Sequence, residues 1–265
     1  MALSESANEL YIVKIGGNII DDDAQLDRFL HNFSQLKGKK ILVHGGGKLA
    51  TELADRLAIP QQMIHGRRIT DAETLKIITM VYAGYINKNM VAALQHLGCN
   101  AIGLSGADGN LILAEKRKAT TIDYGFAGDV LQVNTELLTR LLNDHYLPVI
   151  APVTHNGEGQ LLNTNADTIA QEIARALAPF YRVNLLYTFE KSGVLLDAEN
   201  ESTVIPNLSR ELFVQLIAEK RIFQGMIPKL ENAFEALGSG VKRVLIGKAE
   251  ALDDLVAGRA GTTIS

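Results

Sequence analysis

The sequence has one cysteine, no long basic run and no long apolar segment, and each absence excludes a class of protein. Cys99 alone cannot form an internal disulfide or a cysteine-rich zinc site, which fits a reducing compartment. No segment approaches the ~18 uninterrupted apolar residues that a membrane span needs, and the first ten residues lack the pattern of a secretory signal. We therefore expect a cytoplasmic protein without a membrane partner.

The charge balance argues against a nucleic-acid partner. The 265 residues include 26 Lys and Arg against 30 Asp and Glu, for a net charge of -4. Such a chain has no strong electrostatic attraction to nucleic acid or to anionic lipid. Because 47% of the residues are hydrophobic and 21% are charged, the composition is that of a globular protein, and small molecules are its expected partners.

Short β-branched runs alternate with longer helical patterns, which is typical of α/β proteins with an open, mainly parallel sheet sandwiched by helices. Strands are predicted at residues 11–16, 40–45, 100–106, 146–153, 183–189 and 242–247. Helices are predicted at residues 24–36, 47–58, 71–96, 135–144, 166–177, 208–219 and 229–238. Alternating runs at 111–133 and a turn at 154–160 predict inserted β-hairpins.

Few features of the sequence indicate where one domain ends and the next begins. The sequence has no internal repeat, low-complexity tract or Pro/Ser linker, so a boundary would be a cleft between lobes rather than a linker. We expect an N-terminal lobe at 1–175 and a C-terminal lobe at 176–265.

Residues 41–50, ILVHGGGKLA, place three glycines between a predicted strand and a predicted helix. A P-loop is excluded, because Leu42 stands where its first glycine belongs and Leu49 where its hydroxyl residue belongs. A relaxed dinucleotide-binding pattern is present, but the acidic ribose ligand expected about 20 residues later is missing. The glycines still allow an anion to approach the backbone and a helix N-terminus. The alternative is a tight turn without a ligand.

A second pair of glycines also follows a predicted strand. Lys14 stands just before Gly16 and Gly17, so an ammonium group and backbone donors could converge on one anion. In an open parallel sheet, ligands bind at the carboxyl ends of the strands. The alternative for Lys14 is an ordinary solvated lysine at a strand end.

Three polar residues precede or open the predicted helix at 166–177. Asn163 and Asn165 alternate on an extended segment, and Asp167 follows at the helix start. Asp167 could simply cap the helix, which is worth roughly 1 kcal/mol, or the three groups could orient a polar substrate and a lysine. Lys229 stands at the start of another helix, where it opposes the helix dipole and a nearby negative group would explain it.

Nine segments, in order from Tyr11 to Ile264, resemble the amino-acid kinase family and, within it, the N-acetylglutamate kinases. The segments are VKIGGN, VHGGGKLA, HGRRITD, GYINKNMVAAL, GLSGADG, PVIAPV, LNTNADTIA, GMIPKLENA and GTTI. VHGGG is shared by several members of the superfamily, whereas NTNAD together with GMIPKL is more specific to this kinase. The resemblance implies ATP-dependent phosphorylation of the γ-carboxylate of an N-acylglutamate, which yields an acyl phosphate in arginine biosynthesis.

The resemblance also implies roles for individual residues. Lys14 and Lys229 match lysines that neutralise charge on the transferring phosphoryl group, and Asp167 matches the aspartate that holds both lysines. Four glycines match family residues whose backbone N–H groups line the phosphoryl path: Gly16, Gly17, Gly46 and Gly47. Arg68 and Asn163 match family residues that bind the acyl-amino acid. Since a carboxylate nucleophile is already ionised, no general base is required, and His44 is interpreted as a satisfied core or loop histidine.

ATP is expected in a site built from about residues 183–247, where the sequence departs from the family. The family usually has Asp-Val-x-Gly here, but this chain has TFEKSGV, so Glu190 and Lys191 replace Asp and an apolar residue. The expected ATP-site residues are Glu190, Lys191, Gly193, Gly225 and Met226. Mg2+ would bridge the ATP phosphates and be held mostly by phosphate and water, with no protein metal ligands.

Fewer residues bear on the regulation of the protein, its oligomeric state and the acyl group of its substrate. Hexameric, arginine-inhibited members of the family carry an extra N-terminal helix, and only about ten residues precede the first strand here. We therefore expect an arginine-insensitive homodimer in which the helix at 71–96 contributes its apolar face, unless that face is buried within one subunit. Arg67, beside Arg68, could bind a second carboxylate, which favours N-succinylglutamate over N-acetylglutamate unless Arg67 points away.

Other functions remain open at this stage. A sibling kinase that acts on carbamate, aspartate or glutamate would share the fold. A catalytically silent nucleotide or amino-acid sensor would share it too, although such a sensor need not retain both Lys14 and Lys229.

Overall fold

The computed structural model describes residues 8–64, 67–119, 121–197, 199–222 and 226–265. The chain forms two compact units, one from the residues up to Lys40 with Ile173–Ser265, here unit 1, and one from Ile41–Glu172, here unit 2. The chain therefore does not divide at a single point near residue 175. Residues 8–40 group with the C-terminal part because β1 (Glu9–Ile15) pairs in parallel with β11 (Arg182–Phe189) along its whole length.

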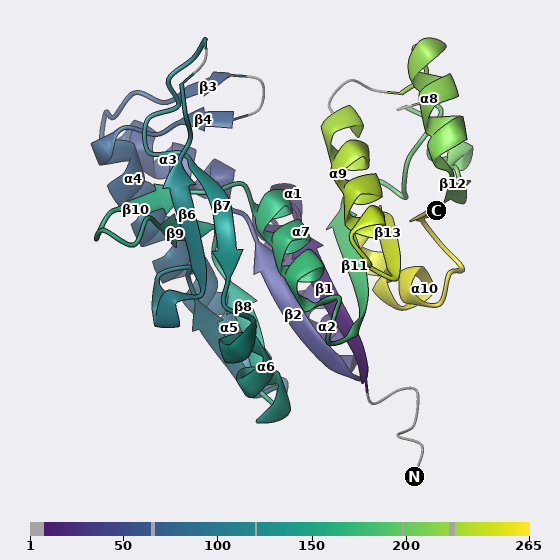
Figure 1. The fold of residues 1–265 in the computed structure, drawn as a ribbon, viewed down its shortest axis with the longest axis horizontal. Helices are drawn as coiled ribbons and strands as arrows, with labels where there is room; N and C mark the ends of the chain where they lie inside the picture. Colours follow the sequence, from purple (N-terminus) through teal and green to yellow (C-terminus); the bar gives the residue numbers. More distant parts are fainter. Residues whose placement is uncertain (1–7, 65–66, 120, 198, 223–225) are drawn as a thin grey trace. The chain divides into compact units, whose positions relative to one another are not determined.

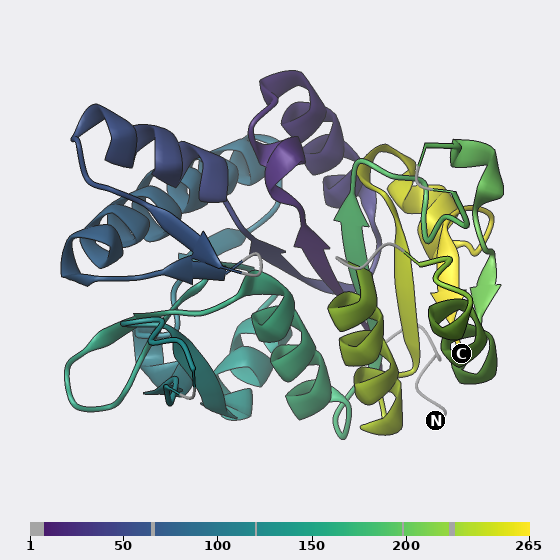
Figure 2. The same cartoon turned by 90° about the horizontal axis from the view of Figure 1, so that it is seen from above.

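Unit 1 is built on a mainly parallel sheet. Its strand order is β12-β14-β13-β11-β1, and only β13 with β14 is antiparallel. The remaining strands are β12 (Asn207–Leu208), β13 (Arg243–Lys248) and β14 (Thr262–Ile264). The helices are α1 (Gly17–Ile20), α2 (Asp23–Gln35), α8 (Arg210–Ala218), α9 (Ile227–Gly238) and α10 (Leu252–Val256), with 3-10 turns η4 (Glu201–Thr203) and η6 (Ala249–Ala251). Figure 2 shows α9 on one face of this sheet and α2 on the other.

Unit 2 contains most of a second parallel group of strands, in the order β2-β8-β5. These are β2 (Lys39–His44), β5 (Ala101–Leu104) and β8 (Leu147–Ile150). The helices of this part are α3 (Gly47–Arg56), α4 (Ala72–Ile78), the π-helix η2 (Thr79–Ile86), α5 (Asn87–His96) and α6 (Thr135–Asn143), and α7 (Ala166–Leu177) begins in this unit. The expected helix at 71–96 is therefore continuous but has a π-helical centre.

A small antiparallel-rich sheet completes unit 2, in the order β10-β9-β6-β7. Hairpins join β6 (Ile112–Lys116) to β7 (Gly128–Val133) and β9 (Val153–His155) to β10 (Leu161–Asn163), as the sequence predicts (Figure 1). The hairpin of β3 (Gln62–Ile64) and β4 (Arg67–Ile69) and the turn η3 (Asp108–Asn110) were not predicted.

The predicted strands all form, because their apolar runs are the buried parts of the sheets. The central strands β8 and β11 are buried almost throughout, as expected for parallel strands covered on both faces. The open, mainly parallel sheet with inserted hairpins is confirmed. No helix in the described part of the chain is long and apolar enough to cross a membrane.

Candidate active site

The glycine loop of unit 2 joins β2 to α3 and packs against the π-helix η2. Gly46 has φ +140°, and a methyl group built on it would lie 2.1 Å from Ile86 Cδ1. That backbone conformation and that clearance both require glycine. Because α3 begins at Gly47, the first amide groups of this helix lie in the same loop. Gly46 and Gly47, both predicted site residues, therefore form one rigid turn at a strand end.

His44 precedes this loop and is fully buried. Its Nδ1 lies 2.9 Å from Gly45 O, and its Nε2 lies 3.1 Å from Nδ2 of Asn87, which is also fully buried. Burial, together with the positive charge of Lys88, lowers the pKa of His44 to about 4, although the hydrogen bond to Gly45 opposes this shift. His44 is thus neutral near pH 7 and hydrogen-bonded on both ring nitrogens, in agreement with its interpretation as a core histidine.

Arg68 is buried beside the glycine loop. Its Nη2 donates to Gly47 O and to Thr51 Oγ1, both at 2.9 Å, and its Nη1 donates to Gln61 Oε1. Arg68 is only 8% exposed, yet all three of its hydrogen-bond acceptors are neutral. None of the carboxylates that the structure describes forms an ion pair with it. A buried guanidinium in such surroundings is able to bind an anion.

Arg67 lies on the other face of the same strand. Arg67 is exposed whereas Arg68 is buried, as the alternation of side chains along β4 requires. This geometry therefore gives no reason to expect Arg67 next to a substrate that Arg68 binds.

Asn163 is connected to Arg68 through Thr70. Asn163 Nδ2 donates to Thr70 Oγ1 at 3.0 Å, and Thr70 Oγ1 donates to Arg68 O at 3.2 Å. Thr70 is fully buried, so this short chain of hydrogen bonds is shielded from water. It brings together Asn163 and Arg68, which are far apart in the sequence.

The helix cap near Asp167 comes from a different residue. Asn165 Oδ1 accepts from the backbone N–H groups of Asp167 at 2.8 Å and of Thr168 at 3.1 Å. Asn165 is exposed and makes the capping bonds of α7, whereas Asp167 is a half-buried acid in the first turn. The capping alternative considered for Asp167 thus applies to Asn165 instead.

Lys14 and the glycines after it lie at the carboxyl end of β1 in unit 1. Gly16 N donates to Thr188 O at 2.9 Å, and Thr188 Oγ1 donates to Lys14 O at 3.0 Å. These bonds lock the ends of β1 and β11 together. Lys14 is half-buried, and the Cα of Gly16 packs closely enough that an added methyl group would lie 3.3 Å from Phe189 Cβ.

Unit 1 also contains a pocket of about 370 Å³, of a size suited to a small ligand. It is lined by Phe189, Glu190, Lys191, Gly193, Val194, Leu195, Glu199, Ile222, Met226 and Lys229. Four of the five residues expected at the ATP site line it; Gly225 lies outside the described residues. Sequence reasoning missed its apolar wall, although Val194 ends the motif TFEKSGV and Leu195 directly follows it.

Individual contacts shape this pocket. Lys229, in the first turn of α9, places its Nζ 5.4 Å from the ring centre of Phe189. Lys191 forms an ion pair with Glu201 at 3.8 Å. Gly193 has φ +157°, and an added methyl group would lie 2.7 Å from Thr262 Oγ1, so no side chain fits there. The wall of the pocket thus has a charged part, with two lysines and two glutamates, and an apolar part.

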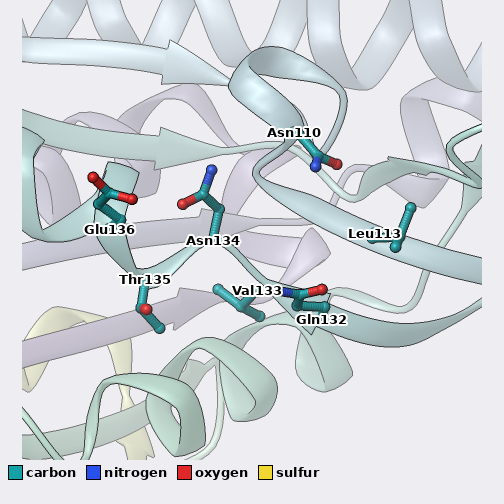
Figure 3. A pocket seen from close by; sticks show the side chains of 7 residues that line it. All are labelled: Asn110, Leu113, Gln132, Val133, Asn134, Thr135 and Glu136. Carbon is teal, nitrogen blue, oxygen red and sulfur yellow. The ribbon is translucent and has the colours of Figure 1, made fainter.

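A second pocket, of about 310 Å³, lies in unit 2 and contains no predicted site residue (Figure 3). It is lined by Asn110, Leu113, Gln132, Val133, Asn134, Thr135 and Glu136. Asn134 caps α6, because its Oδ1 accepts from Leu137 N, and its Nδ2 donates to Gly109 O at 3.0 Å. Its polar groups therefore already stabilise the loop.

Comparison with known proteins identifies the family. The model of the amino acid kinase family matches residues 9–248. An acetylglutamate kinase of Cytophaga hutchinsonii is 54% identical over 249 residues, covering 94% of each chain. Another, of Parabacteroides distasonis, is 52% identical over 241 residues, covering 91% of this chain and 94% of that protein.

A solved structure shares the fold at lower identity. The N-acetylglutamate synthase of Neisseria gonorrhoeae, complexed with coenzyme A and N-acetyl-glutamate, superposes with a TM-score of 0.83 at 22% identity. The alignment covers 98% of this chain and 60% of that one. This similarity shows the fold, whereas the family match and the two relatives show the family. The chain belongs to the amino acid kinase family, and within it to the acetylglutamate kinases.

Proposed function

We propose that this kinase transfers the γ-phosphoryl group of ATP to the γ-carboxylate of N-acetylglutamate. The relatives that carry the name acetylglutamate kinase are 52% and 54% identical over more than nine-tenths of this chain. The product is an acyl phosphate, which fits a role in arginine biosynthesis.

The single structural observation that best supports this substrate is the buried guanidinium of Arg68. Taking a charge out of water costs several kcal/mol unless an opposite charge compensates it. The described part of the chain supplies Arg68 with only neutral acceptors. A carboxylate of the amino-acid substrate would supply the missing negative charge, and Asn163 is linked to the same group through Thr70.

Phosphoryl transfer requires positioning and charge neutralisation more than covalent help. We assign charge neutralisation at the transferring group to Lys14 and Lys229, and the positioning of these lysines to Asp167. The backbone N–H groups of Gly16, Gly17, Gly46 and Gly47 would donate to the phosphoryl oxygens and the substrate. The attacking carboxylate is already ionised, which agrees with a neutral, fully bonded His44 that serves as no base.

The pocket of unit 1 fits the remaining substrate, ATP. Its apolar residues Val194, Leu195, Ile222 and Met226 suit a nucleobase, and its lysines Lys191 and Lys229 suit phosphates. Among the described residues no group of three His, Cys, Asp or Glu side chains could hold a metal ion. Mg2+ would be held chiefly by phosphate and water, and it would supply charge neutralisation at the phosphates when bound.

For the acyl group we propose acetyl, the group in the names of the relatives. The alternative, succinyl, depended on Arg67 lying beside the substrate. Arg67 is exposed on the face of β4 opposite to Arg68, so it provides no reason to prefer a second carboxylate.

Assembly and location stay predictions. Four apolar residues at helical spacing along the helix at 71–96 are all buried within the chain itself: Leu75, Ile78, Tyr82 and Ile86. A homodimer would instead use Met80 and Tyr85 of η2, which are 54% and 64% exposed. Large exposed apolar side chains on one helix are a common feature of subunit interfaces. We propose a cytoplasmic homodimer on that basis and on the composition.

The decisive experiment is trapping of the acyl phosphate with hydroxylamine. The purified protein is incubated with ATP, Mg2+ and, separately, N-acetylglutamate, N-succinylglutamate, glutamate, aspartate or carbamate. We expect hydroxamate from N-acetylglutamate in preference to the others. A preference for unacylated substrates would indicate a sibling kinase, and no product from any of them by folded protein would favour a nucleotide or amino-acid sensor.

A further inference from the structure

A buried chain of hydrogen bonds connects β8 to the glycine loop in unit 2. Asn87, the first residue of α5, donates from Nδ2 to Val149 O at 2.9 Å and approaches His44 Nε2 at 3.1 Å. His44 in turn approaches Gly45 O with Nδ1 at 2.9 Å. Both side chains are 0% exposed, and neither has a role in the proposed reaction.

The partners of Asn87 determine which ring nitrogen of His44 carries the proton. Lys88 Nζ donates to Asn87 Oδ1 at 3.1 Å, so the oxygen of the amide faces the ammonium group. The nitrogen of the amide therefore faces both Val149 O and His44 Nε2, and towards Nε2 it can only donate. Nε2 must then hold a lone pair, and the single proton of the neutral ring is on Nδ1, which donates to Gly45 O.

The hydrogen bond between His44 and Gly45 O also determines the direction of the Gly46 N–H group, which belongs to the same peptide. The Gly45–Gly46 peptide is planar and trans, so its C=O and N–H point in opposite directions. Holding the oxygen against the imidazole therefore turns Gly46 N–H away from it. Within the residues that the structure describes, this N–H donates no backbone hydrogen bond. The backbone of Gly46, at φ +140°, is open only to glycine.

We propose that His44, held by Asn87, is a positioning residue that orients the Gly45–Gly46 peptide so that Gly46 N–H is presented to the transferring phosphoryl group. The inference rests on the proposed kinase activity. Preorganised backbone donors lower a barrier because they need no reorientation during the reaction. If the peptide were free to rotate, its carbonyl oxygen could face the phosphoryl oxygens and repel them.

Two substitutions separate the donor function of His44 from its volume. In His44→Asn the side-chain amide can occupy the place of Nδ1 and still donate to Gly45 O. In His44→Gln the amide reaches the place of Nε2, so it can contact Asn87 but not Gly45 O. The measurement is the rate of phosphoryl transfer in a single turnover, together with the dissociation constants of ATP and N-acetylglutamate.

The expected order is specific to a positioning role. His44→Asn should retain transfer within about threefold of the wild type, whereas His44→Gln should slow it by roughly 10- to 100-fold with little change in either dissociation constant. Equal transfer rates in folded His44→Asn and His44→Gln would overturn the proposal. So would a slowdown that follows the loss of thermal stability rather than the position of the donor.

A spectroscopic test covers the case in which a variant does not fold. With 15N-labelled histidine, multiple-bond 15N–1H NMR of the wild type identifies the protonated ring nitrogen. We expect the Nδ1–H tautomer at pH 7, and an Nε2–H tautomer would overturn the proposal. A wild type that forms no acyl phosphate from N-acetylglutamate would remove the proposed function and this inference together, whereas an active wild type with the wrong tautomer would remove the inference alone.

Discussion

Arg67 and Arg68 are adjacent and chemically identical, yet the fold gives them opposite surroundings. Arg68 is 8% exposed and bonded to Gly47, Thr51 and Gln61, whereas Arg67 is exposed. The pair is therefore an internal control for the role of a guanidinium in substrate binding.

Replacement of each arginine by lysine should separate the two roles. Arg68→Lys should raise KM for N-acetylglutamate by roughly 10- to 100-fold, because an ammonium cannot hold a carboxylate and three anchoring acceptors in the same planar arrangement. Arg67→Lys should leave KM nearly unchanged. Steady-state kinetics of both variants test this, and an equal response would mean that Arg68 does not contact the substrate.

The two lysines of the proposed transfer site should affect catalysis and not folding. Lys14→Met and Lys229→Met should each lower kcat by roughly 100- to 1000-fold, because each removes a charge felt mainly in the transition state. Lys37→Met, an exposed lysine of unit 1, is the matched control. Near-normal kcat in either site variant would exclude that lysine from the mechanism.

The low pKa of His44 predicts a pH dependence of stability. The folded protein keeps His44 neutral down to about pH 4, whereas the unfolded chain protonates it near pH 6.5. Stability from this group is therefore fully present above pH 6.5 and is lost as pH falls towards 4. Between pH 7 and pH 5 the loss should be about 2 kcal/mol.

Urea denaturation at the two pH values measures this loss. His44→Gln should lack this component, so the difference between wild type and variant isolates it from the titration of carboxylates such as Glu9, whose pKa is lowered by its bonds to Lys242 and Tyr11 although burial opposes that shift. Identical pH slopes in the two proteins would contradict a buried, neutral His44.

At the scale of elements, the start of α7 places a capping residue, Asn165, two positions before Asp167, which is proposed for the site. Asn165 caps the helix, and Asp167 is in its first turn. Asn165→Ala should destabilise the protein by about 1 kcal/mol through loss of the cap. Asp167→Asn should instead lower kcat by roughly 100-fold, because it would no longer hold the lysines in place.

Thermal denaturation and kinetics on both variants measure the two effects. If Asp167→Asn changed only the melting temperature, Asp167 would be a structural residue of the first turn, and its assignment to the site would be wrong.

The π-helix η2 is another element with two faces. Tyr82 and Ile86 are buried against Gly46 of the glycine loop, and Met80 and Tyr85 are exposed. A π-helix is rare and often occurs at functional sites. Here its inner face contacts the residue whose backbone must adopt φ +140°.

At the scale of the whole molecule, the exposed face of η2 predicts the mode of assembly. Met80→Glu with Tyr85→Glu should convert a dimer to monomers, because burying two carboxylates in an apolar interface is unfavourable. Light scattering with size-exclusion chromatography measures the mass. Val214→Glu, on the exposed face of α8, is the control, since Val214 is 58% exposed. A wild type that is monomeric or hexameric would refute the dimer.

The sequence predicted the regular elements well where their signal was local. The strand runs at 11–16 and 183–189 and the helix at 166–177 formed close to the expected bounds, because continuous apolar runs and helical spacing report burial directly. The β3–β4 hairpin was missed because its strands are three residues long and Met63 is exposed. The π-helical centre was missed because apolar spacing does not distinguish it from an α-helix.

By itself, the sequence determined the fold class, the family and the identities of the charged and glycine residues proposed for the site. These follow from local pattern and from residues that keep their chemistry wherever they lie. Tertiary structure alone decided which arginine is buried, which residue caps α7, and which groups contact the ring nitrogens of His44. Each of those depends on partners distant in sequence, such as Val149 and Asn87 for His44, and a local pattern carries no information about such partners.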